Sequence, residues 1–494
     1  MKRPNYFIKT ERAFSGVRKS AWIVTLAVAI GGQFYPRLGL LVPFIMAALI
    51  GMSFLKGRHW CGNYCPHGSF FDFLLLPISR NKKIPTLLIS KITVVLFFLF
   101  FMFNLSRRFW TVFQNIANIS LLDSVGMIFS TTYLMVLIVG GLLAVLITPR
   151  TWCQFCPMGT IQTLSYKLGK AIGLAQSQDE KVTAEHADLC HSCGKCARVC
   201  PMQLTPYKEF DENNNQFNDE RCIKCSTCVE NCPAGILSLS TAKQADELKE
   251  KADLDGFQES AYYKGEIKEV RELKEDIKEY TIKLLAPAKM NLTPGQFILI
   301  KVDDDLSRAY TISSANKEGT EISITVKRLE DGYGTNLLFD KFKEGDRVEI
   351  KGPMGKELRI DHKKKKLLFV ANGIGITPFV AAAQNLLEYR DTYNFDGDIT
   401  LLYGVRYEDD LIYDDLFTRL ARKHPNFHYY KTLSRQDSIN ARKGYVTNIL
   451  NEIEIDADTT VYICGTKAMA QDIQKILLEK GVPQESISYE DFAA

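Results

Sequence analysis

Long apolar runs alternate with short polar segments over the first third of this 494-residue chain. The runs cover about 21–35, 38–55, 84–104 and 131–148, and each is near the length of a helix that crosses about 30 Å of hydrocarbon, the first being the shortest. Very few acidic residues separate the runs, which argues against a buried soluble core. The pattern predicts a transmembrane domain of four helices over residues 1–165.

A different pattern follows residue 261. Short alternating apolar runs, separated by turn residues, predict a small antiparallel β-barrel over 262–361. Continuous apolar strands then alternate with helical runs over 365–494, which predicts βαβ units and a parallel sheet. The charged, helix-prone stretch 241–261 is expected to be a linker. The expected barrel strands are 265–271, 279–285, 296–302, 309–313, 321–327 and 347–351, and the expected parallel strands are 366–371, 398–404, 427–434 and 460–464.

Charge divides the chain in a similar way. Residues 1–160 contain 16 basic and three acidic side chains, whereas the remaining residues contain 45 basic and 54 acidic ones. Most Lys and Arg residues of the front lie at the N-terminus, in the second loop and at Arg150. The positive-inside rule therefore places both chain ends in the cytoplasm and residues 106–130 outside. We expect a multi-pass protein of the cell membrane, in contact with membrane lipid, whose domains after residue 165 lie in the cytoplasm. We expect no nucleic-acid partner.

Twelve of the 13 cysteines form four tight groups, each followed by proline. Cysteines so close together suit metal clusters better than disulfides, and such clusters indicate a reducing compartment. Two groups within 180–240 have the spacing C-x2-C-x2-C-x3-C-P of a bacterial ferredoxin with two [4Fe-4S] clusters, in which the fourth cysteine of each group serves the other cluster. The predicted ligand sets are Cys190, Cys193, Cys196 and Cys232 for one cluster, and Cys222, Cys225, Cys228 and Cys200 for the other.

The other two groups belong to an internal repeat. Arg58-His-Trp-Cys61-Gly-Asn-Tyr-Cys65-Pro resembles Arg150-Thr-Trp-Cys153-Gln-Phe-Cys156-Pro, and each copy follows the second apolar run of a pair. Two helix pairs packed about a pseudo-two-fold axis would bring four sulfurs together at the cytoplasmic rim of the membrane, as an iron–sulfur cluster or an iron site requires. Buried structural thiols or a disulfide are the alternatives. We name the four cysteines Cys61, Cys65, Cys153 and Cys156 the tetracysteine site.

A glycine turn joins the first parallel strand to a helix at Asn372-Gly373-Ile-Gly375-Ile-Thr377-Pro378. Such a turn lets backbone N–H groups approach a phosphate, and the helix N-terminus favours the negative charge. It differs from the usual G-x-G-x-x-G pattern, so a purely structural turn is the alternative.

Residues 262–494 resemble the ferredoxin–NAD(P) reductase family, which binds FAD and a nicotinamide nucleotide. The resemblance implies that Arg308 pairs with the FAD pyrophosphate, that Tyr310 packs against the isoalloxazine and that Thr311 lies near the reactive flavin nitrogen. It also places Cys464 near the nicotinamide ring, which makes Thr311 and Cys464 the candidate catalytic residues. The motifs that carry it are Arg308-Ala-Tyr310-Thr311, Gly332-Tyr-Gly334-Thr335, Gly352-Pro353-Met-Gly355, the glycine turn, Tyr403-Gly404-Val-Arg406 and Cys464-Gly465.

The same resemblance supplies the remaining binding residues. Ser434-Arg435 ends a strand where family members contact the 2′-phosphate of NADP, which favours NADPH over NADH. Phe492 is the candidate for the aromatic residue that covers the flavin, and Glu490 is a candidate proton relay. The other implied FAD residues are Ser313, Val326, Lys327, Gly334 and Thr335, and the implied nucleotide residues are Gly373, Gly375, Thr377, Pro378, Arg406, Ser434, Arg435 and Gly465.

Residues 60–235 resemble the membrane ferredoxins of the nitrate- and nitrous-oxide-reductase accessory type. Those proteins pass electrons toward extracytoplasmic partners or help maturation, and fusion to a flavin module departs from their pattern. The order of the parts predicts a membrane-bound NAD(P)H oxidoreductase that sends electrons through FAD and two [4Fe-4S] clusters to a metal site at the membrane and on to an acceptor, such as a quinone, an extracytoplasmic redox protein or a ferredoxin. A membrane-anchored NAD(P)H–ferredoxin oxidoreductase and a redox assembly or regulatory protein are the alternatives.

Overall fold

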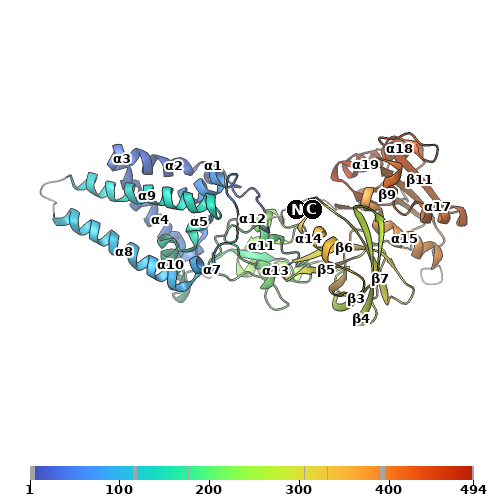
Figure 1. Cartoon of the computed structure of the whole chain (residues 1–494), viewed down its shortest axis with the longest axis horizontal. Helices are drawn as coiled ribbons and strands as arrows, with labels where there is room; N and C mark the ends of the chain where they lie inside the picture. The colour runs from blue at the N-terminus through green and yellow to red at the C-terminus, as the bar shows by residue number, and fades with distance from the viewer. Residues whose placement is uncertain are drawn as a thin grey trace. The chain divides into compact units, whose positions relative to one another are not determined.

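The structure is a computed structural model that describes residues 6–114, 120–175, 177–304, 306–330, 332–389 and 395–491. The chain divides into two compact units, Met1–Ala252 and Asp253–Ala494. Figure 1 labels most of the helices and several of the strands.

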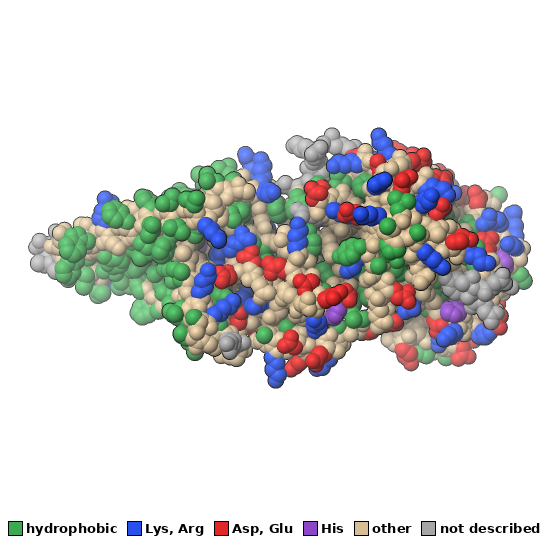
Figure 2. All heavy atoms as spheres, turned by 90° about the horizontal axis from the view of Figure 1, so that it is seen from below, with side chains coloured by type: hydrophobic (Ala, Val, Ile, Leu, Met, Phe, Trp, Pro, Cys, Tyr) green, Lys and Arg blue, Asp and Glu red, His purple; other side chains and the backbone are tan. Residues whose placement is uncertain are grey.

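Three helical segments among the described residues of the first unit are long and apolar enough to cross a membrane. They are Pro36–Lys56, which contains α4 (Leu41–Lys56), α8 (Lys91–Gln114) and α9 (Leu121–Leu146). The first expected run instead consists of short pieces: α2 (Trp22–Leu26), a π-helical turn (Ala27–Gly31) and α3 (Gly32–Phe34). No residue of α8 is buried, and Figure 2 shows hydrophobic side chains covering this end of the first unit.

Small residues let these helices approach closely. A Cβ atom on Gly126 of α9 would overlap the carbonyl oxygen of Pro36, and one on Gly32 would overlap the side chain of Ser130. Close backbone contact at glycine is a common way for helices to pack in lipid, where apolar burial alone does not drive association. Shorter helices complete this part: α1 (Gly16–Ser20), α5 (His59–Asn63), α6 (Pro66–Ser69), the π-helical turn Phe70–Leu75, α7 (Thr86–Ile89), the 3-10 turn Trp152–Gln154 and α10 (Pro157–Ala171).

The ferredoxin part of the first unit is built on a two-stranded antiparallel sheet of β1 (Lys181–Ala184) and β2 (Leu237–Ser240). Two short helices, α11 (Lys195–Val199) and α12 (Thr227–Glu230), contain the third cysteine of each group, Cys196 and Cys228. The stretch expected as a linker begins with α13 (Ala242–Lys251), whose Ala245 is buried and accepts a hydrogen bond from Asn215. This helix therefore belongs to the ferredoxin part.

The second unit begins with the predicted antiparallel barrel, which is confirmed. Six strands close in the order β3-β4-β7-β6-β5-β8 around a core of aliphatic and aromatic side chains. One helix, α14 (Tyr333–Lys341), lies between the last two strands in sequence. The strands are β3 (Ala261–Lys274), β4 (Ile277–Ala286), β5 (Phe297–Asp303), β6 (Leu306–Ala315), β7 (Glu321–Lys327) and β8 (Arg347–Met354).

The predicted parallel sheet is also confirmed. Six strands lie in the order β12-β11-β10-β9-β13-β14, all parallel, with separate hydrophobic clusters on the two faces. The first crossover helix, α15 (Thr377–Glu388), follows the glycine turn directly. The strands are β9 (Lys366–Asn372), β10 (Asp398–Val405), β11 (Phe427–Leu433), β12 (Arg442–Lys443), β13 (Thr460–Gly465) and β14 (Ile487–Asp491), and the other helices are α17 (Asp414–Lys423), α18 (Val446–Glu452) and α19 (Lys467–Glu479).

Candidate functional site

The ferredoxin cysteines surround two separate cavities. The first ferredoxin site is lined by Cys190, Cys193, Cys196 and Cys232, and the second by Cys200, Cys222, Cys225 and Cys228. Residues with positive φ angles, among them Ser192 at 44° and Lys224 at 53°, turn each loop tightly around its cavity. Each donor set of four thiols, three from one loop and one from the other, fits a [4Fe-4S] cluster.

The tetracysteine site lies around a third cavity of about 110 Å³, also lined by apolar side chains of α4, α8 and α9. Cys61 and Cys153 are buried within the short turns of the two repeats. Cys65 and Cys156 are the N-caps of α6 and α10, and the following proline occupies the first helical position, where its missing N–H costs nothing. The 15-residue α10 thus directs its N-terminus, which favours negative charge, toward the site.

Each repeat is held by the arginine of the other repeat. Arg58 donates to the Cys153 carbonyl at 2.9 Å, and Arg150 donates to the Cys61 carbonyl at 3.1 Å. Each arginine also faces a cysteine of its own repeat, since Arg58 Nη2 lies 4.0 Å from Cys61 Sγ and Arg150 Nη1 lies 3.5 Å from Cys153 Sγ. The two repeats are thus held together by equivalent contacts, each arginine binding a carbonyl group of the other repeat.

Two glycines of the repeat make room for these guanidinium groups. A Cβ atom on Gly68 would lie 2.5 Å from Arg150 Nη1, and one on Gly159 would lie 2.8 Å from Arg58 Nη2. The motif Cys-Pro-x-Gly is therefore explained by the arginine that crosses over from the other copy.

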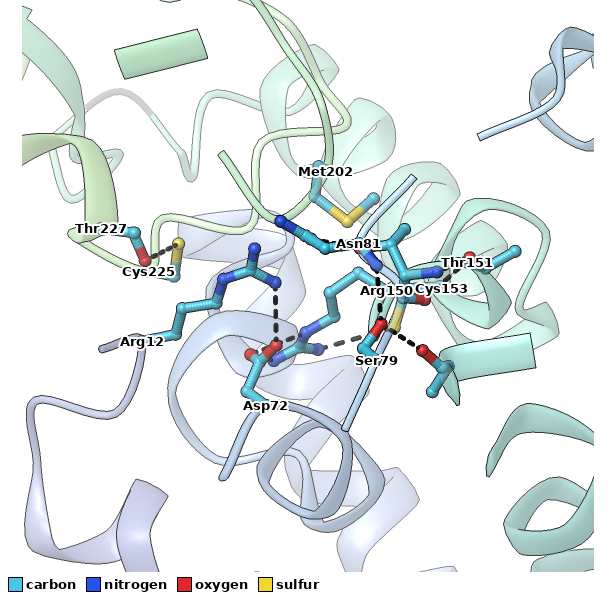
Figure 3. A network of polar contacts seen from close by, with 12 residues as sticks. Arg12, Asp72, Ser79, Asn81, Arg150, Thr151, Cys153, Met202, Cys225 and Thr227 are labelled. Atoms are coloured by element: carbon cyan, nitrogen blue, oxygen red, sulfur yellow. Dashed lines mark hydrogen bonds and ion pairs between the residues drawn. The ribbon is translucent and has the colours of Figure 1, made fainter. Parts of the chain in front are cut away.

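A buried ionic cluster adjoins the tetracysteine site (Figure 3). The Asp72 carboxylate accepts hydrogen bonds from Arg150 at 2.7 and 2.9 Å and from Arg18, and Arg12 Nη1 lies 3.6 Å from Asp72 Oδ1. Burial alone would raise the pKa of Asp72, but the guanidinium groups, Arg150 foremost, lower it to about 2. Asp72 was not predicted as a site residue. It is one of only three acidic residues among the first 160, and this rarity could have drawn attention to it.

The charges of this region do not balance. Four arginines are almost fully buried, and Asp72 is the carboxylate that faces three of them. Arginine stays protonated in proteins, so these five side chains carry a net charge of +3. Arg58 and Arg150 lie against Cys61 and Cys153 of the tetracysteine site, whereas Arg12 and Arg18 lie toward Cys200 and Cys225 of the second ferredoxin site. A set of thiolates bound to iron is a fitting counter-charge, because buried charge requires a partner. The arginines are Arg12, Arg18, Arg58 and Arg150.

The barrel presents the residues that the FAD resemblance implies along β6. The hydroxyl groups of Tyr310 and Thr311 are buried and have no hydrogen-bond partner among the described residues, so polar groups are available for a ligand. Gly334 lies against Arg308, because a Cβ atom there would be 2.9 Å from Arg308 Nε. These features fit FAD. Val326 packs in the barrel core, the Thr335 hydroxyl donates to the Gly332 carbonyl at the start of α14, and Ser313 accepts a hydrogen bond from Thr325.

A cavity of about 940 Å³ opens at the carboxyl ends of β9, β10 and β13. Ligands of open parallel sheets bind in such positions. A Cβ atom on Gly375 would overlap the carbonyl oxygen of Cys464, so this turn requires glycine for close packing. The size and position of the cavity fit a dinucleotide. Of the implied residues, its lining includes Lys327, Gly373, Gly375, Arg406, Ser434 and Gly465.

Other implied residues lie outside that lining. Cys464 is fully buried in the core of the sheet, and Gly465 and Thr466, which follow it, reach the cavity. Thr377 and Pro378 are buried at the start of α15, where the Thr377 hydroxyl donates to the Ile374 carbonyl. Arg435 is exposed. Phe492 lies outside the described residues.

Glu490 on β14 provides a pH test of this unit. Its Oε2 is buried without a hydrogen-bond partner among the described residues, and burial raises its pKa to about 7. In the unfolded chain the Glu490 carboxyl ionises at about pH 4.5, whereas in the folded chain it ionises only at about pH 7. The folded state should therefore lose stability as the pH rises from about 4.5 to about 7. Glu490→Gln should therefore raise the free energy of unfolding at pH 8 by up to about 3 kcal/mol and leave it unchanged near pH 4. The exposed Glu485→Gln is the control, and an equal shift at both pH values would contradict the prediction.

Four family models match the chain. An oxidoreductase FAD-binding domain matches residues 264–358, and an oxidoreductase NAD-binding domain matches 369–475. A 4Fe-4S dicluster domain matches 183–233, and a 4Fe-4S binding domain matches 38–85 and 131–175, which contain the tetracysteine site. FAD-, NAD(P)- and 4Fe-4S-binding domains are therefore present.

Curated relatives agree with the models. The chain is 30% identical to the electron transfer component of toluate 1,2-dioxygenase from Pseudomonas putida over 48% of this chain and 69% of that protein. It is 28% identical to a flavohemoprotein from Burkholderia sp., over 40% of this chain and 51% of that protein, and 28% identical to the reductase component of phenol 2-monooxygenase from Pseudomonas sp., over 47% and 65%. It thus spans between half and about two thirds of these relatives. The chain belongs to the family of FAD- and NAD-binding electron-transfer oxidoreductases, with 4Fe-4S ferredoxin domains joined to the reductase domains.

Proposed function

We propose that this protein is a membrane-bound NAD(P)H oxidoreductase that sends electrons through FAD and two [4Fe-4S] clusters to a third cluster at the tetracysteine site, and on to an acceptor in the membrane or outside it. The observation that carries the proposal is the pair of buried arginines, Arg58 and Arg150, that faces the tetracysteine site. A [4Fe-4S] cluster with four thiolates has a net charge of about −2 when oxidised and −3 when reduced, which these arginines offset in part.

A multi-iron cluster suits this site better than a single iron ion. No group of three or more His, Cys, Asp or Glu side chains within the described ranges could hold one metal ion. In a cubane cluster each thiolate binds a different iron atom, so the sulfurs stand further apart.

The apolar helices and the distribution of charge support a position in the membrane. Arg37 pairs with Asp123, and Arg108 donates to Thr131, at the loop end that the positive-inside rule places outside. The tetracysteine site follows the opposite ends of the helices, beside the ferredoxin part. In this proposal the short α2–α3 segment forms the fourth, marginal span with its flanking turns.

The residues of the second unit would hold the two nucleotides. FAD supplies the chemistry that accepts a hydride and releases electrons one at a time. Arg308 would bind its pyrophosphate, Tyr310 would pack against the flavin, and the free hydroxyl of Thr311 would hydrogen-bond its reactive edge. Gly373 and Gly375 would let the dinucleotide approach the backbone, and Gly465 would make room for the nicotinamide.

Arg406 and Ser434 line the part of the cavity at the ends of β10 and β11, where the adenosine end of the nucleotide would lie. This position suits contacts with the 2′-phosphate of NADPH, which we therefore propose as the donor. The exposed Arg435 would add a further positive charge near that phosphate. Exchange of NADPH for NADH in the assays below distinguishes the two.

The relatives support one other function. The named components of toluate 1,2-dioxygenase and phenol 2-monooxygenase transfer electrons to oxygenases. By analogy, this chain would pass electrons to a ferredoxin or oxygenase on the cytoplasmic side and use its apolar helices as an anchor.

Membrane vesicles distinguish the two functions. Right-side-out vesicles loaded with NADPH should reduce an impermeant dye outside if electrons cross the membrane. Anaerobically purified protein should contain about twelve iron atoms and as many acid-labile sulfides per FAD, against about eight if only the ferredoxin clusters are present. Dye reduction confined to the cytoplasmic face, with about eight iron atoms, would reject the proposal in favour of the anchored reductase.

A further inference from the structure

The tetracysteine repeats contact one ferredoxin site through backbone. A Cβ atom on Gly62, the residue after Cys61, would overlap the carbonyl oxygen of Ile223 and lie 3.2 Å from the Cα atom of Cys225. The φ angle of Gly62 is not in the left-handed region, so close approach alone calls for glycine here. The loop of one metal site therefore rests directly on the loop of another.

Two side-chain contacts fix this approach. Asn63 Nδ2 donates to the Lys224 carbonyl at 3.1 Å, and Gln154 Nε2, from the second repeat, donates to the Met202 carbonyl at 3.2 Å. Lys224 is itself held by a buried ion pair with Asp179. Both repeats thus contact residues that lie beside cysteines of the second ferredoxin site.

The equivalent position of the first ferredoxin site differs. Ile223 follows Cys222 and is 1% exposed, whereas His191, which follows Cys190 in the same motif, is partly exposed. The arginines of the ionic cluster also favour the second site, because Arg18 interacts electrostatically with Cys225 and Arg12 with Cys200. Figure 3 shows Arg12, Asp72, Arg150, Cys153 and Cys225 in one view.

We infer that the second ferredoxin site is the direct electron partner of the tetracysteine site, across the contact of Gly62 with Ile223 and Cys225. The inference rests on the proposed function. With clusters bound, one electron would leave the second ferredoxin site, oxidising it, and would enter the tetracysteine site, reducing it, with no bond made or broken. The first ferredoxin site then precedes the second in the path, and Gly62 is a positioning residue.

Gly62→Ala tests this order, with Gly51→Ala in α4 as the matched control, because a Cβ atom on Gly51 meets nothing within 4 Å. Full-length protein, purified without oxygen, is mixed with NADPH and followed by rapid-freeze EPR. Gly62→Ala should keep its iron and reduce its ferredoxin clusters at the normal rate. Reduction of the tetracysteine cluster should slow several-fold, because the added methyl group separates the two loops and electron transfer slows steeply with distance.

If Gly62→Ala loses iron, Asn63→Ala serves as the second variant. It removes the hydrogen bond to Lys224, together with one to the His59 carbonyl within the same short helix, and should slow the same step several-fold. Normal reduction of the tetracysteine cluster in iron-replete Gly62→Ala and Asn63→Ala would overturn the inference and leave the proposed function intact. Absence of a third cluster from the wild-type protein would instead overturn the proposed function.

Discussion

Replacing both Cys61 and Cys153 by serine is expected to abolish electron delivery to an impermeant dye outside right-side-out vesicles that contain NADPH. Both thiols are buried at the tetracysteine site, and serine is a much poorer ligand of iron–sulfur clusters than the cysteine thiolate. The same variant should retain NADPH-dependent dye reduction on the cytoplasmic face, because the flavin residues lie in the second unit. The measurement is the ratio of the two rates, in right-side-out and inverted vesicles.

The cytoplasmic rate is the internal control for folding and flavin content. Iron analysis should show a loss of about four atoms per FAD. Outward delivery that persists in the double variant would remove the tetracysteine site from the electron path.

Asp72→Asn is expected to cause the largest loss of stability of any single change in the first unit. The carboxylate is fully buried and faces Arg12, Arg18 and Arg150. Removing one partner of a buried ion pair leaves uncompensated charge and typically costs about 3–5 kcal/mol. The unfolding midpoint of the purified protein in detergent should fall accordingly, and iron should be lost from the tetracysteine site before it is lost from the ferredoxin sites.

Asp123→Asn is the matched control, since Asp123 also pairs with an arginine of the same unit but at an exposed position. Exposed ion pairs contribute little to stability, so its midpoint should stay close to that of the wild type. If the two substitutions lowered the unfolding midpoint equally, burial would not explain how much the Asp72 cluster contributes to stability.

Much of the architecture follows from local pattern. Alternating apolar residues predicted the barrel strands, and the expected strand 321–327 coincides with β7 (Glu321–Lys327). Continuous apolar runs likewise predicted β9 and β10. The edge strand β14 was missed because Ile487–Asp491 is short and polar and becomes a strand only by pairing with β13. Closure of the barrel, through pairing of β3 with β8, is also a long-range feature that no local pattern contains.

The candidate sites were predicted unevenly for the same reason. Cysteine spacing alone indicated the two ferredoxin ligand sets, which the structure places around separate cavities. Asp72 and Gly62 were not singled out, because their roles depend on residues far away in the sequence, such as Arg150 and Ile223. Cys464 shows the opposite case: the motif was visible, but the side chain lies in the core of the sheet and its neighbour Gly465 reaches the cavity.

The crossed arginines have a consequence for how the front of the protein can be divided. Since Arg58 occupies the space beside Gly159, and Arg150 the space beside Gly68, neither hairpin contains all the groups that support its own cysteines. A fragment that carries only one copy of the repeat would have an arginine without its carbonyl acceptor. Its glycine would face the space that the arginine of the other copy normally fills. Each copy therefore completes the surroundings of the other copy's cysteines, and a substitution of the arginine or the glycine in one copy also changes the environment of its counterpart.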